Sequence, residues 1–330
     1  MKQDNSSGYA ALRDTAAIVE RAGTGWIQLS GPDRRTYLQG LLTNDIEALQ
    51  PGTGCYAAML TAQGRMMTDM RVLELGDSVL LDVPAMVTAS IRDHLDRFIF
   101  AEDVQVADVT ASWAAVGLYG PEAIDVLQRA RVEGGVPAEL FHSTRVRLAG
   151  VDAILVRSDE IGIEGFEFIV DPASADSIRE ALVAAGAVPA SAEDVENVRI
   201  ESGHPRFGVD MDTDTIPLEA GIEGRAISRT KGCYVGQEVI VRVQDRGQGR
   251  VARRLVGLTL PSSAALPAAG AAIVADGKEA GRVTSSVFST ALARPIALAY
   301  VRRDLVGGDT PVSVAGSGEA TVTLLPLVRR

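Results

Sequence analysis

After Gly249 the sequence contains strand and turn patterns but no helical pattern, and this feature restricts the fold more than any other. A run of short strands without helices has to close or cover its sheet edges. Asp276 and Gly277 form a hairpin signal between two of the strands. We therefore predict a small closed or nearly closed β-barrel over residues 250–330, with strands at residues 255–260, 271–274, 281–288, 296–301, 311–314 and 320–325.

Residues 1–249 mix helical and strand patterns. Strands at residues 55–60, 66–75 and 78–83 are separated by short turns, so we expect a meander. Ser191 and Asp194 resemble a capping arrangement at the start of a helix over residues 191–202. Other helices are expected where apolar residues recur at helical spacing, near residues 37–42, 86–98, 121–127 and 178–182.

Composition narrows the possible functions. The 330 residues carry a net charge of −11, which argues against direct nucleic-acid binding or anionic-membrane binding, because both need a surplus of Lys and Arg. The N-terminus has no apolar signal core, and no apolar run is long enough to span a bilayer. With Cys55 and Cys233 as the only cysteines and three histidines, we expect a cytoplasmic protein with reduced thiols and no metal site.

Residues 231–238, Lys-Gly-Cys-Tyr-Val-Gly-Gln-Glu, bring a cation, a thiol, a phenol, an amide and a carboxylate together. The apolar residues that follow, 239–243, are expected to form a strand. A polar loop that leads into a buried strand is a common position for binding residues. By spacing alone, this octapeptide is typical of a turn with solvated charges and a small buried cysteine.

The octapeptide resembles the K-G-C-Y-x-G-Q-E signature of YgfZ-type folate-binding proteins, relatives of the glycine-cleavage T-protein, an aminomethyltransferase. The resemblance extends from about Gly23 to near the C-terminus. It implies an α+β fold with a T-protein-like α/β body, an antiparallel lobe inserted at about residues 50–110, and a C-terminal β-barrel, arranged as a ring around a central channel. T-proteins carry an apolar F-[IL]-G motif where this chain has Lys-Gly-Cys-Tyr.

Asp69 lies in the strand expected at residues 66–75, where it shares one face with Arg71 while Thr68 and Met70 point to the other. By spacing alone, this pattern is typical of an exposed Asp–Arg strand face. By resemblance, Asp69 falls where T-proteins place the Asp that contacts the folate nitrogens and positions the aminomethyl carrier. Asp69 is therefore expected to be both a folate-binding and a catalytic residue.

Glu201 ends the helix expected at residues 191–202 and lies at the edge of its buried face. A fixed carboxylate can accept both adjacent N–H donors of a pterin ring. The alternative is a solvated Glu, which the helix dipole disfavours at a C-terminus. By resemblance, this segment is similar to the R-L-E-x-G stretch of T-proteins, whose Glu grips the pterin.

Cations around the octapeptide are candidates to pair with the carboxylates of the glutamyl tail of folate, although each one alone is typical of a surface charge. They are Arg225, Arg229, Lys231 and Arg242. The same cations favour a thiolate at Cys233, which makes this residue a catalytic candidate. The alternative for Cys233 is a buried, inert cysteine.

The resemblance implies a protein that binds tetrahydrofolate or a derivative and acts in iron–sulfur cluster assembly or repair, with an iron–sulfur client protein as partner. Its link to tRNA modification is indirect. One alternative is a folate-dependent aminomethyltransferase or demethylase, which needs a donor such as a lipoyl carrier protein. Another is a non-catalytic scaffold that handles a cluster protein through Cys233.

Overall fold

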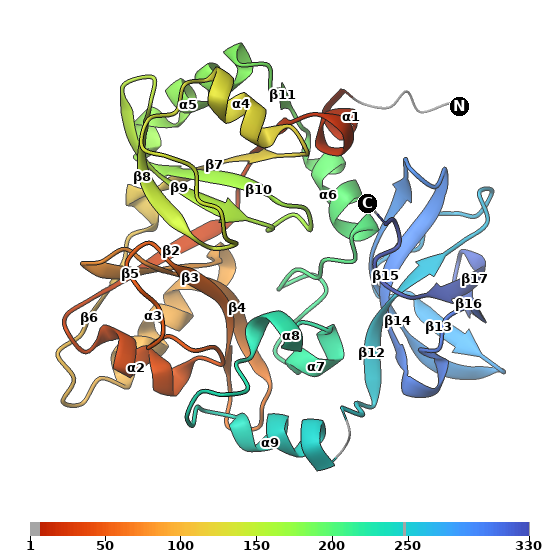
Figure 1. Cartoon of the computed structure of the whole chain (residues 1–330). Helices are drawn as coiled ribbons and strands as arrows, with labels where there is room; N and C mark the ends of the chain where they lie inside the picture. The colour runs from red at the N-terminus through yellow and green to blue at the C-terminus, as the bar shows by residue number, and fades with distance from the viewer. Residues whose placement is uncertain (1–6, 247–248, 330) are drawn as a thin grey trace. The chain divides into compact units, whose positions relative to one another are not determined.

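The computed structural model describes residues 7–246 and 249–329 (Figure 1). The chain divides into two compact units. The first comprises Met1–Thr61, Met67–Asp194 and Arg225–Val235, and the second comprises Ala62–Met66, Val195–Gly224 and Gly236–Arg330. Among the described residues, no helix has the length and apolar character needed to cross a membrane.

The first unit contains two sheets and the helices that cover them. Its helices are α1 (Ser7–Asp14), α2 (Arg34–Leu41), α3 (Thr88–Arg97), α4 (Ala123–Arg129) and α5 (Ala175–Ala184). Its strands are β1 (Ala17–Glu20), β2 (Thr24–Ser30), β3 (Gly54–Leu60), β4 (Met66–Glu74), β5 (Ser78–Pro84), β6 (Gln105–Asp108), β7 (Ala114–Tyr119), β8 (Ser143–Leu148), β9 (Val151–Ser158), β10 (Gly165–Val170) and β11 (Val188–Pro189). One sheet has the order β3-β4-β5-β2-β6, which confirms the predicted meander of β3, β4 and β5.

The other sheet of this unit has the order β11-β1-β7-β10-β9-β8, and its strands pair antiparallel except for β1 with β11. Helices α4 and α5 pack on it through Leu127 and Leu182, whereas α2 and α3 pack on the β3–β6 sheet through Leu38 and Leu95 (Figure 1). Each helix buries one apolar stripe, as its 3.6-residue periodicity predicts. Each sheet therefore has its own helix-covered core.

The two sheets also share a core of their own. Trp26 on β2 and Leu73 on β4 pack with Ile154 on β9. On β4, Met70 faces the helices while Leu73 faces the second sheet, so the alternation predicted for this strand is confirmed. Asp69 and Arg71 share the face of Leu73 and therefore point toward the other sheet rather than toward solvent.

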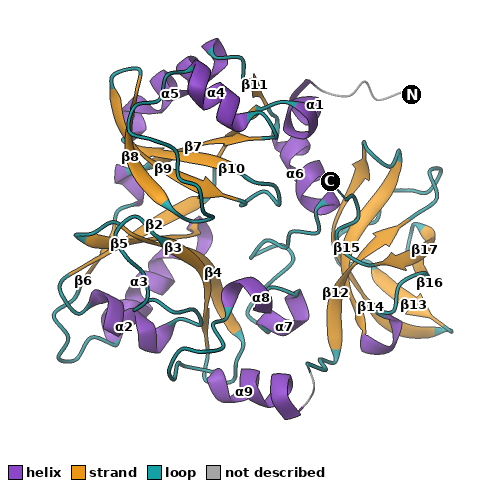
Figure 2. Cartoon of the chain, viewed as in Figure 1, coloured by secondary structure: helices purple, strands orange, loops and turns teal. Residues whose placement is uncertain are grey.

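The second unit contains a closed barrel, and every strand predicted after Gly249 is present in its described part. Asp276 and Gly277 have φ values of 50° and 70° in the turn between β13 and β14, as a type I′ hairpin requires. The barrel order is β12-β15-β14-β13-β16-β17 (Figure 2). Its strands are β12 (Arg253–Thr259), β13 (Ala272–Ala275), β14 (Lys278–Ser289), β15 (Arg294–Arg302), β16 (Thr310–Val314) and β17 (Gly318–Thr323).

Helix α6 (Ala192–Glu201) starts with the predicted capping arrangement. The Ser191 N–H and hydroxyl both donate to Asp194 Oδ2 at 2.8 Å, and the Asp194 N–H donates back to Ser191 Oγ at 3.2 Å. These reciprocal bonds satisfy donors that the first turn of a helix leaves free. The short helices α7 (Pro217–Ala220) and α8 (Glu223–Ala226) follow it in the chain.

The strand expected at residues 239–243 is wrong. These residues form helix α9 (Gln237–Val241) and the start of a π-helical turn, Arg242–Arg246. Gly236 precedes the helix with a φ of 84°, so the backbone turns where a strand would continue. A run of β-branched residues favours a strand only where neighbouring strands are available to pair with it, and these residues pair with none in the described structure.

Candidate functional site

Asp69 is a half-buried carboxylate that accepts a hydrogen bond from a phenol. It lies on β4, and its Oδ2 accepts a 2.6 Å hydrogen bond from the hydroxyl of Tyr56 on β3. Burial raises the pKa of Asp69, and the bond from Tyr56 offsets part of this rise. The exposed strand face favoured by spacing alone is therefore wrong for Asp69, and also for Arg71, which is 2% exposed.

A cation lies on the ring of Tyr56. The guanidinium carbon of Arg225, at the end of α8, is 4.9 Å from the ring centroid, a typical cation–π distance. Arg225 Nη2 donates to both oxygens of Asp159, at 2.7 and 2.6 Å. Asn44 ties the two backbones together, because its Nδ2 donates to the carbonyls of Tyr56 and Arg225. We call Tyr56, Asp69, Asp159 and Arg225 the Asp69 cluster.

Asp69 and Arg225 were predicted from the sequence, whereas Tyr56 and Asp159 were not. A signal for Tyr56 exists: it and Asp69 lie at nearly equal distances on either side of the turn at residues 61–65, and paired strands bring such residues opposite each other. Asp159 follows β9 in a connection to β10, and no sequence pattern links it to Arg225. The structure therefore adds Tyr56 and Asp159 to the two predicted residues and joins all four through contacts between described residues.

Lys231 is buried and caps helix α2. Its ammonium donates to the carbonyls of Gln39, Leu42 and Asn44, at 2.6, 2.5 and 2.9 Å. These carbonyls lie at the end of α2, where backbone acceptors lack intrahelical partners and a positive charge is favourable. Burial lowers the pKa of Lys231 to about 8. Since three carbonyls occupy this ammonium, its predicted contact with a folate tail stays a prediction that the geometry does not favour.

We call residues 231–238 the signature loop. Its other residues, and those near it, differ in exposure. Cys233 is a free, exposed cysteine, so the alternative of a buried cysteine is wrong for it. Tyr234 is buried, and its ring lies 5.1 Å from the ammonium of Lys231. Arg229 is exposed, and its role as a tail ligand stays a prediction. Burial raises the pKa of Cys55, the second cysteine, to about 12, which keeps it a neutral thiol at pH 7.

Glu201 is fully buried in the second unit, so the solvated alternative is wrong. Its Oε1 accepts hydrogen bonds from the Ser289 hydroxyl at 2.6 Å and from the Ala291 N–H at 3.3 Å. One turn earlier, Asn197 Nδ2 donates to the carbonyl of Phe288 and to Thr290. These bonds hold α6 against the β14–β15 connection. That Glu201 binds a pterin, or shares a cavity with Asp69, stays a prediction.

A buried ion network lies between the sheets of the first unit. Arg71 on β4 contacts the carboxylates of Asp82 on β5 and Glu167 on β10, and Arg21 joins the same group. Burial favours a neutral Glu167, but the two arginines outweigh it and lower its pKa to about 2. Glu160 lies at the edge of the network, and burial raises its pKa to about 7. These charges pair with one another, as buried charges must.

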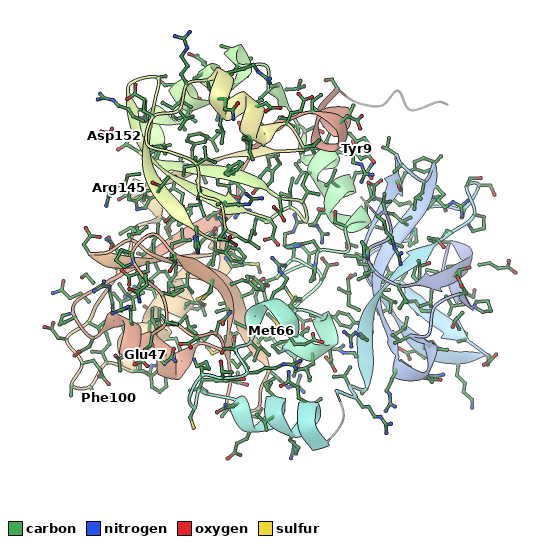
Figure 3. The ribbon with its side chains drawn as sticks, viewed as in Figure 1. Tyr9, Glu47, Met66, Phe100, Arg145 and Asp152 are labelled. Atoms are coloured by element: carbon green, nitrogen blue, oxygen red, sulfur yellow. The ribbon has the colours of Figure 1, made fainter. Side chains whose placement is uncertain are left out.

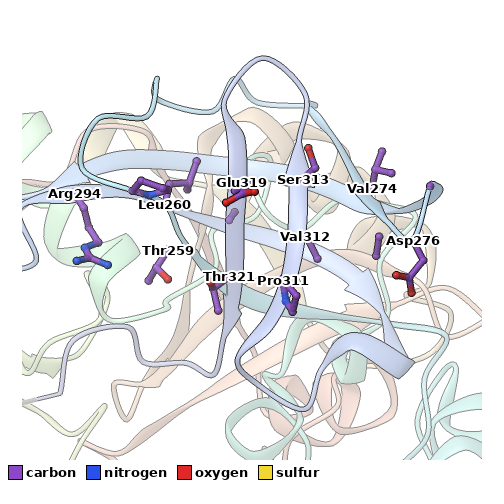
Figure 4. A pocket seen from close by; sticks show the side chains of 14 residues that line it. Thr259, Leu260, Val274, Asp276, Arg294, Pro311, Val312, Ser313, Glu319 and Thr321 are labelled. Carbon is purple, nitrogen blue, oxygen red and sulfur yellow. The ribbon is translucent and has the colours of Figure 1, made fainter.

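Two surface cavities lie away from these residues. One, of about 540 Å³, is on the barrel and is lined by residues such as Thr259, Arg294 and Glu319 (Figure 4). The other, of about 520 Å³, is in the first unit and includes Arg145 and Asp152 (Figure 3). Neither is lined by a predicted site residue. In the part of the chain that the structure describes, no three His, Cys, Asp or Glu side chains gather as metal ligands.

Comparisons with known proteins agree along the whole chain. Residues 1–231 match the GCVT N-terminal domain, and residues 253–328 match the glycine cleavage T-protein C-terminal barrel domain. The chain is 32% identical over 323 residues to an aminomethyltransferase of Rubrobacter xylanophilus, covering 98% of this chain and 86% of that protein. It is 30% identical over 322 residues to an aminomethyltransferase of a Nostoc species, covering 94% and 84%.

Among solved structures, the glycine cleavage system aminomethyltransferase T of Bartonella henselae superposes with a TM-score of 0.84. It is 23% identical and covers 97% of this chain and 88% of that one, a likeness that shows the fold. The predicted T-protein fold with its barrel is confirmed. The chain belongs to the glycine cleavage T-protein family.

Proposed function

We propose that the chain binds tetrahydrofolate at Asp69 and transfers a one-carbon unit to it from an aminomethyl donor. The observation that carries this proposal is a half-buried carboxylate with a raised pKa, held in one orientation by Tyr56. Such a carboxylate can accept a proton from an amine and return it, which is what general acid–base catalysis requires. The aminomethyltransferase relatives favour this reading of the site.

The reaction makes two demands on a carboxylate. When an aminomethylated thiol gives its methylene carbon to tetrahydrofolate, both acceptor nitrogens of the folate lose a proton. One proton leaves with the thiol and the other with ammonia, so that methylenetetrahydrofolate, a free thiol and ammonia are formed. A fixed carboxylate beside these nitrogens orients them and stabilises the positive charge that develops there.

The test is the formation of methylenetetrahydrofolate from tetrahydrofolate and an aminomethylated lipoyl carrier protein. Asp69→Asn removes the charge and the proton acceptor but keeps the shape, so we expect a rate lower by about 10²- to 10⁴-fold. Asp77→Asn is the matched control, because Asp77 is exposed in the turn between β4 and β5. Equal rates for the two variants would contradict the role of Asp69, and no product from the unaltered chain would contradict transfer.

A second function, the YgfZ-type role in iron–sulfur cluster assembly or repair, is supported by the signature loop. Cys233 is exposed between the buried side chains of Lys231 and Tyr234. The loop therefore presents a thiol from an anchored backbone, an arrangement that aminomethyl transfer does not use. In this role the folate stays bound, the partner is an iron–sulfur client protein, and the effect on tRNA modification is indirect.

Cys233→Ser separates the two functions. If the YgfZ-type role operates, cells carrying this variant lose iron–sulfur enzyme activity while the purified protein binds tetrahydrofolate as before. If transfer alone operates, cells carrying the variant keep their iron–sulfur enzyme activity and the purified protein keeps its folate affinity, since Cys233 does not belong to the Asp69 cluster. The measurements are the activity of an iron–sulfur enzyme in cell extracts and folate affinity by calorimetry.

A further inference from the structure

We propose that Arg225, anchored by Asp159, is a positioning residue that acts on Asp69 through the ring of Tyr56. This inference rests on the proposed function of Asp69 in binding folate. It gives Arg225 a different task from the predicted one, which was to pair with the carboxylates of the folate tail. Three consecutive contacts of the Asp69 cluster carry it.

The first contact fixes the guanidinium. One nitrogen of Arg225 donates to both carboxylate oxygens of Asp159, and these side chains are 33% and 19% exposed. An arginine so placed loses much of its freedom to turn toward solvent, because charge-assisted hydrogen bonds are roughly twice as strong as neutral ones. Asp159 therefore holds Arg225 over one face of the cluster.

The second contact places the cation on a phenol. Arg225 lies on the ring of Tyr56, which is 6% exposed, and Asn44 fixes the backbones of both residues. A cation on the ring face draws electron density from the phenol. The hydroxyl of Tyr56 then becomes a stronger hydrogen-bond donor.

The third contact delivers this effect to Asp69. Tyr56 donates to Asp69 Oδ2 at 2.6 Å, a short bond of the kind made to a carboxylate. Burial and the negative charge of Asp82 on β5 favour the neutral form of Asp69, whereas Tyr56 and Arg225 favour the charged form. Arg225 thus favours an ionised and oriented carboxylate, which a site for folate nitrogens needs.

The structure supplies a matched control for Arg225. Arg157 also pairs with a carboxylate, Glu164 at 2.5 Å, and lies 5.8 Å from the ring centroid of Phe166. It therefore makes the same two kinds of contact, but its ring has no hydroxyl and no link to Asp69. An effect transmitted through the three contacts should therefore appear when Arg225 is replaced and not when Arg157 is replaced.

The experiment compares Arg225→Met with Arg157→Met. The carboxyl carbon of Asp69, labelled with ¹³C, reports the pKa of this residue by NMR without any ligand, and calorimetry reports affinity for tetrahydrofolate. We expect Arg225→Met to raise the pKa of Asp69 and to weaken folate binding by about tenfold at pH 7, the scale of one partly buried cation–π contact. Arg157→Met should change neither, and Arg225→Lys should restore part of the effect.

Two further variants test whether the effect of Arg225 reaches Asp69 through Tyr56. In a Tyr56→Phe background, Arg225→Met should shift the pKa of Asp69 much less, because the hydroxyl that transmits the effect is gone. Asp159→Asn combined with Arg225→Met should be no worse than Arg225→Met alone, since residues that act as a unit are not additive. An unchanged pKa in Arg225→Met, or a full shift in the Tyr56→Phe background, would overturn the inference. A wild-type chain that binds no folate would overturn the proposed function instead, while the NMR result would still decide the positioning role.

Discussion

Asp69 and Arg71 show how two charged residues on one face of one strand take different tasks. Arg71 is surrounded by the carboxylates of Asp82 and Glu167, so its charge is balanced within the protein. Asp69 accepts a hydrogen bond from the hydroxyl of Tyr56 on β3 and is half-buried. The difference lies in the partners that other strands supply to each residue, and it agrees with the proposed role of Asp69 in folate binding.

Glu160 gives a pH-dependent prediction at the residue scale. Its pKa is about 7 in the folded chain against 4.5 in the unfolded one, so the folded chain binds its proton more tightly. Stability contributed by this group therefore falls as pH rises from 4.5 to 7. Glu160→Gln should remove this loss. The unfolding free energy of the variant minus that of the wild type should therefore be larger at pH 8 than at pH 5.

Urea denaturation at the two pH values measures the Glu160 effect. Glu164→Gln is the control, because Glu164 lies in the same β9–β10 connection but makes an exposed pair. Parallel stability curves for wild type and Glu160→Gln would show that Glu160 does not titrate in this range.

At the scale of elements, side chains complete the ends of two helices, one from a distant segment and one from the helix itself. Lys231 caps the end of α2, and Asp194 with Ser191 caps the start of α6. The cap on α6 was predictable from the sequence because its two residues lie three apart. The cap on α2 was not predictable, since Lys231 is far from α2 in the chain and a lone lysine is typical of a surface cation.

The cap on α2 predicts a clear stability change. Lys231→Met keeps an apolar stem but leaves buried carbonyls at the end of α2 without a donor, which costs about 1–3 kcal/mol. Lys278→Met is the control, because Lys278 is exposed on β14. Thermal or urea unfolding should show the loss for Lys231→Met alone; equal stability of the two variants would contradict the capping role.

At the scale of the molecule, local patterns predicted the architecture better than the site. The barrel strands and the meander follow from alternation and turn residues, and the structure confirms them. Helix α9 was not predicted, because β-branched residues such as those at 239–243 favour a strand when the surrounding structure is unknown. Asp159 and Arg225 could not be paired from sequence, because they are far apart in the chain and join only when β9 and α8 are folded.

Titration of the purified chain with tetrahydrofolate, followed by calorimetry, tests the central claim most directly. If Asp69 holds the folate, the wild-type chain and Asp77→Asn bind with the same affinity. Asp69→Asn should then bind at least tenfold more weakly, since a hydrogen bond to a charged group contributes about 1.5–3 kcal/mol. Equal affinity of Asp69→Asn and wild type would contradict the account.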